Sequence, residues 1–355
     1  MRSPSPRAES ALSSLDELLG QAGLTRARLR TRGTLRPAHP DRLARLSPEE
    51  LASLRRPAPA CRIAANGVPC LQAPRWEEIA WLWHGFSTRI GGLSRVYAEN
   101  GSQTELNLGF TPEDERETVR RNRALLAEAV SGSADTPLAA IRQIHSNLVV
   151  VAGLADSARD PLPKADGLMT AEAGILLGIQ TADCTPVLVA DRRRRVVAAF
   201  HAGWRGTVRR IVEAGIGRMR LEFGCRPEDL IAAIGPCNGP CCYAVGEEVR
   251  SAFESQFIYA RELFFEIEDT DPVRARYPMM FLNQRAPGHG LELPRLHLNL
   301  VEANRRQLFA AGLKPASVQI VGGCTSCHPQ LFFSHRASRG RTGRMMSVIG
   351  VNPVG

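Results

Sequence analysis

The chain has 355 residues, of which 44% are hydrophobic and 23% charged, a composition typical of a globular protein with one or two domains. It has no apolar run near the ~18 residues of a membrane span, no signal-like start and no regular cysteine framework, so we expect a cytoplasmic protein that binds no membrane. The net charge of +9 predicts no nucleic-acid partner, because the 11 Arg and 6 acidic residues of residues 1–60 account for more than half of it.

Residues 1–60 are predicted to form an Arg- and Pro-rich N-terminal extension, and residues 61–355 the catalytic domain. Two stretches of the extension match helix capping boxes. One starts near Ser14 with Glu17 in the third helical position, and the other starts at Ser47 with Glu50 in that position. The sequence leaves two interpretations of this extension open, a partly helical segment and a flexible linker.

Short apolar runs predict strands, at 81–86, 141–144, 148–151, 174–179, 186–190, 196–200, 230–234 and 317–321. Helical spacing and capping residues predict helices, at 111–130, 207–219, 245–253 and 298–311. Arg192 to Arg195 lie between two strands and indicate a solvated hairpin turn, whereas residues 257–295 follow no period and are expected to be irregular. Strands and helices that do not alternate strictly predict an α+β fold, with mixed β-sheets in a sandwich and flanking helices.

Three potential metal ligands, His145, Cys184 and His201, each follow a predicted strand. Two imidazoles and one thiolate are a zinc-binding set, and three protein ligands leave one tetrahedral position open, as in catalytic sites. The alternative is a buried cysteine with two hydrogen-bonded histidines. The spacing alone does not decide between these interpretations.

A second group of cysteines follows the pattern Cys-x-x-Cys at Cys324 and Cys327. Cys237, Cys241 and Cys242 could supply further ligands to a second, structural metal. One such pair is a weak signal, and separate buried or surface thiols are the favoured interpretation.

Several motifs resemble one family, in both order and content, across roughly residues 84–350. They are the segments 165–170, 181–186, 201–206 and 234–237, Cys324-Thr325, residues 332–336 and residues 342–344. The chain is identified by them as a member of the bacterial YfiH family, which carries laccase-domain, polyphenol oxidase and peptidoglycan editing factor labels. The chain departs from the family's Phe-Ser-Tyr-Arg-Arg at His335 and Ala337, and this departure bears on substrate preference.

The resemblance implies a zinc-dependent purine nucleoside phosphorylase that also deaminates adenosine, with purine nucleosides and phosphate as partners. Adenosine, inosine, guanosine and methylthioadenosine are the candidate nucleosides. The family's zinc ligands fall on His145, Cys184 and His201. The resemblance also implies the same sandwich fold.

Zinc at this site would act as a Lewis acid and lower the pKa of a bound water to near ~7, which supplies a nucleophile for C6 of adenine. Asp183, beside the Cys184 ligand, either supports the site as a proton carrier or caps the turn. Asp166 either binds substrate or pins the turn at Gly167. The usual zinc-deaminase signature is absent, so a deaminase here would be a different solution on a different fold.

Phosphorolysis needs an anion-binding site beside the ribose. Arg205, between two glycines at a predicted helix start, is the first candidate for it. Arg89 and Arg336 are further candidates for contacting substrate, and Arg344 is a weaker one. Trp204 either stacks on the purine or anchors the packing.

Two other enzyme classes compete with this assignment. The sequence argues against a copper-binding polyphenol oxidase, because a multicopper centre needs paired histidines and the chain has eight His with no two separated by one residue. The site could still bind adventitious copper. Alternatively, Cys184 activated by His201 would make a cysteine-dependent hydrolase acting on peptidoglycan precursors. A pure binding module explains the clustered ligands least well.

Overall fold

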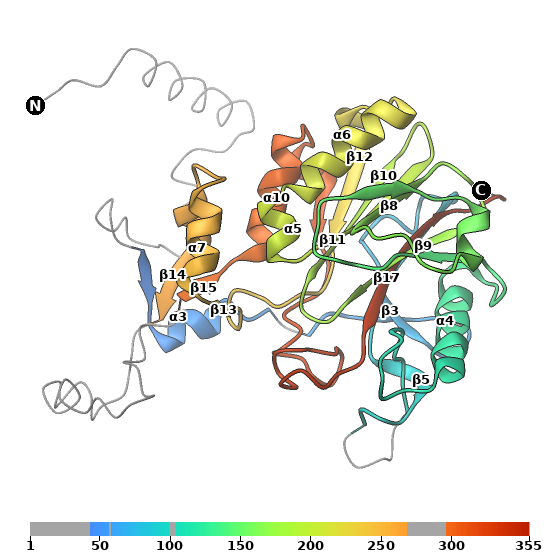
Figure 1. Cartoon of the computed structure of the whole chain (residues 1–355), viewed down its shortest axis with the longest axis horizontal. Helices are drawn as coiled ribbons and strands as arrows, with labels where there is room; N and C mark the ends of the chain where they lie inside the picture. Colours follow the sequence, from blue (N-terminus) through green and yellow to red (C-terminus); the bar gives the residue numbers. More distant parts are fainter. Residues whose placement is uncertain (1–42, 57, 99–103, 268–295, 355) are drawn as a thin grey trace, which may run out of the picture. The chain divides into compact units, whose positions relative to one another are not determined.

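The computed structural model describes residues 43–56, 58–98, 104–267 and 296–354. Two six-stranded sheets dominate it (Figure 1). Their strands are β2 (Arg62–Ile63), β3 (Pro69–Leu71), β4 (Leu82–Ser87), β6 (Leu138–Ala140), β7 (Val149–Val151), β8 (Gly167–Thr170), β9 (Leu176–Thr181), β10 (Thr185–Asp191), β11 (Val196–Ala202), β12 (Leu230–Ile234), β16 (Val318–Ile320) and β17 (Met345–Val351).

The order of the first sheet is β16-β12-β10-β11-β8-β7, and that of the second is β2-β3-β4-β17-β9-β6. Each sheet mixes parallel and antiparallel pairs. In the first sheet β10 pairs antiparallel with β11, while β12 and β16 run parallel. In the second, β17 pairs antiparallel with β9, while β6 and β9 run parallel. The predicted mixed sheets are confirmed.

The two sheets pack face to face because side chains alternate along their strands. Leu188 of β10 and Ala199 of β11 face inward and belong to one core with Ile179 of β9 and Ile349 of β17. The residues between them in sequence point to the outer face. The sandwich interior is therefore built from every second residue of the central strands.

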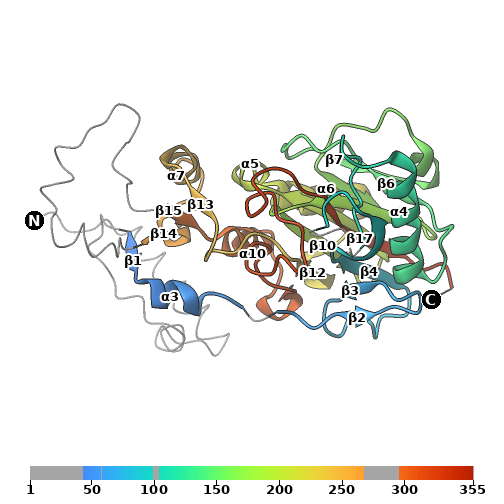
Figure 2. The ribbon, with the colours of Figure 1, turned by 90° about the horizontal axis from the view of Figure 1, so that it is seen from below.

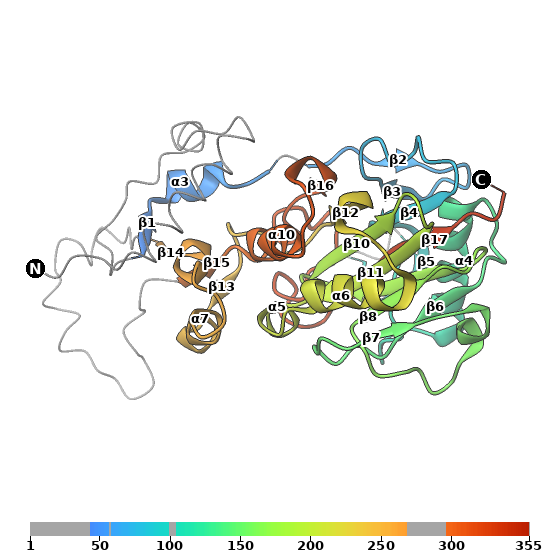
Figure 3. The same cartoon turned by 90° about the horizontal axis from the view of Figure 1, so that it is seen from above.

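Helices cover the outer faces of both sheets. The first sheet packs against α6 (Ile211–Phe223) and α10 (Leu300–Ala310), and Figure 3 shows α6 lying across β10 and β11. The buried Phe200 ring fits there because Gly215 has no side chain: a Cβ on it would lie 2.4 Å from that ring. On the second sheet, α4 (Arg116–Ser131) packs Leu126 against Met346 and Val348. The predicted flanking helices are thus confirmed.

A smaller sheet, with β15 between β13 and β14, lies beside α7 (Figure 2). Three of the four strands of this sheet are β13 (Ala244–Val245), β14 (Phe264–Ile267) and β15 (Leu296–Leu298), and α7 spans Glu247–Glu254. The expectation of an irregular stretch at 257–295 is wrong for residues 260–267, which form the 3-10 helix η4 (Ala260–Leu263) and β14. Residues 268–295 lie outside the described part. The remaining elements are β1 (Ala44–Leu46), α3 (Pro48–Ser53), β5 (Ile90–Ser94), η2 (Leu154–Ala158), α5 (Trp204–Val208), η3 (Pro227–Asp229) and η5 (Pro315–Ser317).

The chain divides into two units, Met1–Arg45 and Leu46–Gly355. The helix expected near Ser14 lies outside the described residues. The second capping box is confirmed at α3: Ser47 Oγ accepts a hydrogen bond from the backbone N–H of Glu50, whose carboxylate accepts one from Ser47. The catalytic boundary at residue 60 stays a prediction. None of the described helices is long and apolar enough to cross a membrane.

Three predicted elements differ from the structure. The helix expected from residue 111 begins at Arg116, because the Asp114 carboxylate binds Ser94 and Asn107 instead of capping a helix. The strand expected at 141–144 is replaced by β6, just before it. The single helix expected at 207–219 is divided into α5 and α6, and Arg210 at the break has a left-handed φ of 59°.

Candidate functional site

The three predicted metal ligands lie together. Their ligand atoms are all within 4.8 Å of one another, and Cys184 Sγ lies 3.9 Å from His145 Nε2. The strand register brings them together: Thr185 of β10 pairs with Ala202 of β11, so Cys184 and His201 lie at the same end of the hairpin. A tetrahedral zinc separates such atoms by about 3.3–3.8 Å, so a small contraction would fit the set to one ion.

Asp166 holds two of these ligands in place. Its carboxylate is fully buried, and Oδ1 lies 2.9 Å from His201 Nδ1. Oδ1 also accepts a hydrogen bond from the backbone N–H of His145, and Oδ2 accepts them from Ile144 and Ser146. His145 itself has a left-handed φ of 57°, and these bonds stabilise that turn. Asp166 therefore holds the turn at His145, whereas the sequence had left open substrate binding and the turn at Gly167.

The charges of the site are coupled. Burial raises the pKa of Cys184, but the charge of His201 and a hydrogen bond from His145 outweigh it and lower this pKa to about 6. Burial lowers the pKa of His201, yet the Cys184 thiolate and Asp166 outweigh it and raise this pKa to about 9. Without metal, the two residues therefore form a thiolate–imidazolium pair near neutral pH.

Gly203 leaves room for the ligands. A Cβ at this position would lie 2.9 Å from Cys184 Sγ and 3.1 Å from His145 Cδ2. Its φ of −67° is open to any residue, so the requirement for glycine is steric. The backbone that joins β11 to α5 thus forms one wall of the candidate metal site.

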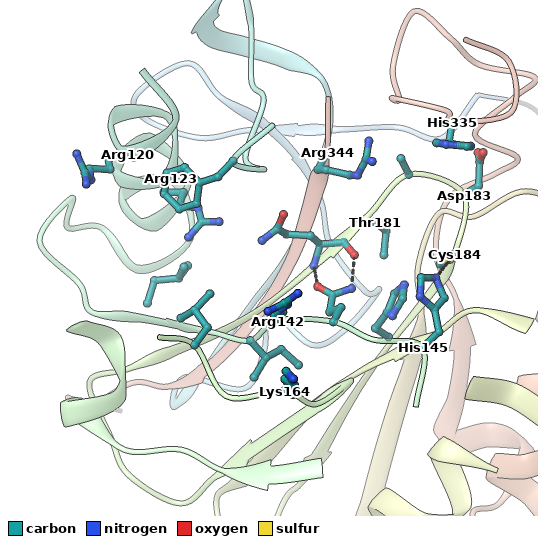
Figure 4. A pocket seen from close by; sticks show the side chains of 18 of the residues that line it. Arg120, Arg123, Arg142, His145, Lys164, Thr181, Asp183, Cys184, His335 and Arg344 are labelled. Atoms are coloured by element: carbon teal, nitrogen blue, oxygen red, sulfur yellow. Dashed lines mark hydrogen bonds between the residues drawn. The ribbon is translucent and has the colours of Figure 1, made fainter. Parts of the chain in front are cut away.

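The ligands open onto a cavity of about 1670 Å³, larger than the about 300–1,000 Å³ of ordinary ligand pockets. Figure 4 shows His145 and Cys184 at one end of it and Arg120 and Arg123 at the other. The acidic side chains in its described lining are Asp160 and Asp183. The basic ones are Arg116, Arg120, Arg123, Arg142, Arg159, Lys164, Arg205, Arg336, Arg339 and Arg344. The cavity is therefore suited to an anionic reactant.

Asp183 lines the cavity, but both its carboxylate oxygens already have partners. Oδ1 accepts a hydrogen bond from Thr325 Oγ1 at 2.6 Å, and Oδ2 accepts one from the backbone N–H of Arg336 at 2.7 Å. Its φ is 95°, a strained value for a residue with a side chain. These contacts favour the capping interpretation, in which Asp183 joins the Cys184 turn to the loop before β17.

Four of the five residues predicted to contact phosphate or substrate line the cavity, namely Trp204, Arg205, Arg336 and Arg344. The Arg205 guanidinium is exposed and lies 4.4 Å from the centre of the Trp204 ring, over its face. Arg336 lies in the same way over Tyr243, at 5.3 Å.

Arg89 lies elsewhere. It forms an ion pair with Glu105, donates to the backbone carbonyl of Pro329 and lies over the Phe333 ring. It is absent from the described lining of the cavity. Its position argues against the substrate contact expected from the sequence, because its charge is paired with Glu105 and its side chain contacts the loop before β17.

Other lining residues were missed by sequence reasoning. Arg142 and Lys164 line the middle of the cavity in Figure 4, and they come from segments that pair with each other. Tyr243 lines the cavity from a further loop, and so does His335, at which the sequence already departs from the family motif. No local motif marks Arg142, Lys164 or Tyr243. The only available signal was that Arg142 lies three residues before a predicted ligand.

The sequence and the fold of this chain are similar to those of known proteins. Residues 83–352 match the family model described as multi-copper polyphenol oxidoreductase laccase. A protein from Bacteroides thetaiotaomicron named purine nucleoside phosphorylase is 34% identical over 274 residues, which cover 76% of this chain and 91% of that protein. The crystal structure of the Bacillus licheniformis hypothetical protein YfiH superposes with a TM-score of 0.65 at 29% identity, covering 82% of this chain and 99% of that one.

The chain belongs to the YfiH family. The predicted resemblance and its sandwich fold are thereby confirmed. Another relative, from an unknown prokaryotic organism, is named adenosine deaminase RL5 and is 33% identical over 214 residues, covering 59% of this chain and 72% of that protein. Copper is in the description of the family model, yet the described part of this YfiH-family chain places only two histidines, His145 and His201, in a group able to hold a metal.

Proposed function

We propose that this YfiH-family enzyme is a zinc-dependent purine nucleoside phosphorylase that also deaminates adenosine. One observation carries the proposal: a three-ligand set of two histidines and a cysteine opens onto a strongly basic cavity. The names of the relatives support the same two activities. Arginine and lysine side chains attract phosphate, and a three-ligand site leaves a position for chemistry.

The residues around the candidate metal fit zinc. Soft thiolate and imidazole ligands suit this ion, and the Asp166–His201 pair provides the carboxylate that commonly orients a zinc-bound histidine. His145, Cys184 and His201 would hold the ion. When bound, zinc would supply Lewis acidity and lower the pKa of a water molecule in the open position.

In phosphorolysis, phosphate attacks C1′ of the nucleoside as the bond to the base breaks, giving ribose 1-phosphate and free base. Arg205 would hold the phosphate dianion, and the exposed guanidinium can leave the Trp204 ring to do so. Trp204 would then be free to stack on the purine. Arg336 would contact the substrate from the opposite loop, with its backbone held by Asp183. In deamination, water replaces the amino group at C6 and ammonia leaves.

The test is a product analysis with adenosine and phosphate. We expect ribose 1-phosphate with adenine, together with some inosine, and loss of both activities and of one zinc equivalent in the Cys184→Ala variant. Free ribose formed equally fast without phosphate would show a hydrolase instead. Full zinc occupancy in Cys184→Ala would show that the metal lies elsewhere.

A second candidate is a cysteine-dependent hydrolase, possible because Cys184, His201 and Asp166 also have the order of a nucleophile, a base and an orienting carboxylate. A muramyl peptide precursor would be its substrate. This function requires activity that survives complete metal removal by a chelator. Activity lost to the chelator and restored by zinc excludes it.

A further inference from the structure

A second group of four cysteines lies between two loops. Cys241 and Cys242 belong to the loop after β12, and Cys324 and Cys327 to the loop after β16. All four sulfur atoms lie within 4.8 Å of one another, with Cys327 Sγ 3.5 Å from Cys241 Sγ and 3.4 Å from Cys242 Sγ. These cysteines are absent from the described lining of the cavity. The proposed catalytic function does not use them.

We propose that Cys241, Cys242, Cys324 and Cys327 bind a structural zinc ion. Four thiolates around one tetrahedral zinc lie about 3.8 Å apart, because each Zn–S bond is about 2.3 Å long. The two distances from Cys327 Sγ, 3.4 and 3.5 Å, are slightly shorter than this value, and all four sulfur atoms lie within 4.8 Å of one another. A cluster of several irons would spread the thiolates over different metal atoms, and so needs wider spacing. Four protein ligands leave no open position, which makes the site structural.

The backbone around the sulfurs has the shape of such a site. Cys324 and Cys327 flank a tight turn in which the N–H of Cys327 bonds to the carbonyl of Cys324. On the other loop, the N–H of Cys242 bonds to the carbonyl of Gly239. Gly239 is itself packed against the group: a Cβ on it would lie 3.0 Å from Cys324 Cβ and 3.4 Å from Cys241 Sγ. The two turns therefore present their sulfurs to a common point.

The ion would join two loops that both reach the cavity. An isolated parallel β-bridge between the backbones of Cys237 and Cys324 already aligns the loops. The first continues to Tyr243, which lines the cavity, and the second holds Thr325, whose hydroxyl binds Asp183. Zinc at the four cysteines would hold this support of the Cys184 turn in place.

The test is zinc stoichiometry in protein purified under reducing conditions. If both proposed sites are occupied, the wild type contains two zinc equivalents per chain. The Cys184→Ala variant should retain one, at the four cysteines. The double variant Cys324→Ser/Cys327→Ser should also retain one, at the catalytic ligands, and Cys61→Ser, outside both groups, should retain two.

A second measurement applies if the double variant folds poorly. Cobalt loaded into the Cys184→Ala protein should give the intense sulfur-to-cobalt charge-transfer absorption of a four-thiolate tetrahedral ion. A Cys184→Ala protein that takes up neither zinc nor cobalt overturns the proposal. So does a thiol titration of metal-free Cys184→Ala protein, freshly purified without reductant, that finds these four sulfurs joined in disulfides. Each result is independent of whether the catalytic site binds zinc.

Discussion

At the scale of single residues, Asp166 is the buried side chain that positions the candidate metal ligands. Burial raises its pKa, but hydrogen bonds from His201 and Ser146 outweigh it and lower this pKa to about 2. A buried carboxylate that is charged at neutral pH can therefore bind the His201 ring and three consecutive backbone N–H groups together. One carboxylate thus orients two candidate metal ligands from different segments.

Replacing Asp166 by Asn should weaken zinc binding by about 10–100-fold, because the uncharged amide has one acceptor atom and orients His201 less well. Affinity is measured by competition with a chelator of known strength, and circular dichroism checks that the fold is kept. Unchanged affinity in a folded Asp166→Asn protein would contradict this role.

Gly203→Ala should lower zinc affinity by about tenfold or more, because the added methyl overlaps Cys184 Sγ and His145. Gly217→Ala is the matched control: a Cβ at that position of α6 meets nothing within 4 Å, and alanine favours helix. The control should bind zinc normally and melt no lower than wild type. Equal zinc affinity in both variants would mean that the backbone at Gly203 can move to make room for the methyl group without weakening zinc binding.

At the scale of elements, the break between α5 and α6 decides which side chains face the cavity. The left-handed Arg210 ends the first helical turn, so the two helices need not share one direction. Trp204 and Arg205 on α5 line the cavity, while Ile211, Val212 and Ile216 on α6 are buried in the core. The short helix α5 therefore lines the cavity, and the longer helix α6 packs into the core.

Arg205→Ala should raise the KM for phosphate by about 10-fold or more with zinc retained, since a hydrogen bond to a charged group contributes about 1.5–3 kcal/mol. The control is Arg220→Ala, which removes an exposed arginine at the end of α6. Initial rates at varied phosphate concentration measure the effect. A normal phosphate KM in Arg205→Ala would move the anion site to the arginines deeper in the cavity.

At the scale of the whole molecule, stability should depend on pH through His84, which is buried under Trp76. Burial lowers its pKa to about 4, and its Nε2 accepts a hydrogen bond from the backbone of Ala73, which requires the neutral ring. The unfolded chain, with an ordinary pKa of 6.5, binds the proton more readily. The contribution of His84 is thus complete above pH 6.5 and is lost as the pH falls toward 4.

Between pH 7 and pH 5, we expect His84 to account for about 2 kcal/mol of lost stability. His84→Gln keeps an acceptor for Ala73 but has no proton to bind, so its stability should fall less over this interval. Urea unfolding of both proteins at the two pH values measures the difference. Parallel losses in wild type and variant would show that His84 is protonated equally in both states.

A truncated chain beginning at Ala60 should keep its turnover on adenosine, because the candidate ligands and the described lining of the cavity lie beyond residue 109. It loses α3 and the carbonyl of Arg56 that binds His328, and so should lose stability, on the order of a few kcal/mol at most. Turnover and thermal melting are compared with the full chain. A large fall in turnover with zinc still bound would show that residues 1–60 contribute to the site.

Local features of this chain were predictable from its sequence. The capping box at Ser47, the hairpin turn at Arg192 to Arg195 and the strand β12 each depend on residues close together in the chain. The three candidate metal ligands could be named for the same reason, since each has a distinctive chemistry and follows an apolar run.

Long-range contacts were decided only by the tertiary structure. The four-cysteine group joins residues 86 apart, Asp166 reaches His145 and His201 from a third segment, and Arg89 turns to Glu105 instead of the cavity. Such long-range contacts depend on the strand register and on the conformation of the loops, to which many distant residues contribute. A sequence pattern records which groups are available, and the packed sheets determine which of them meet.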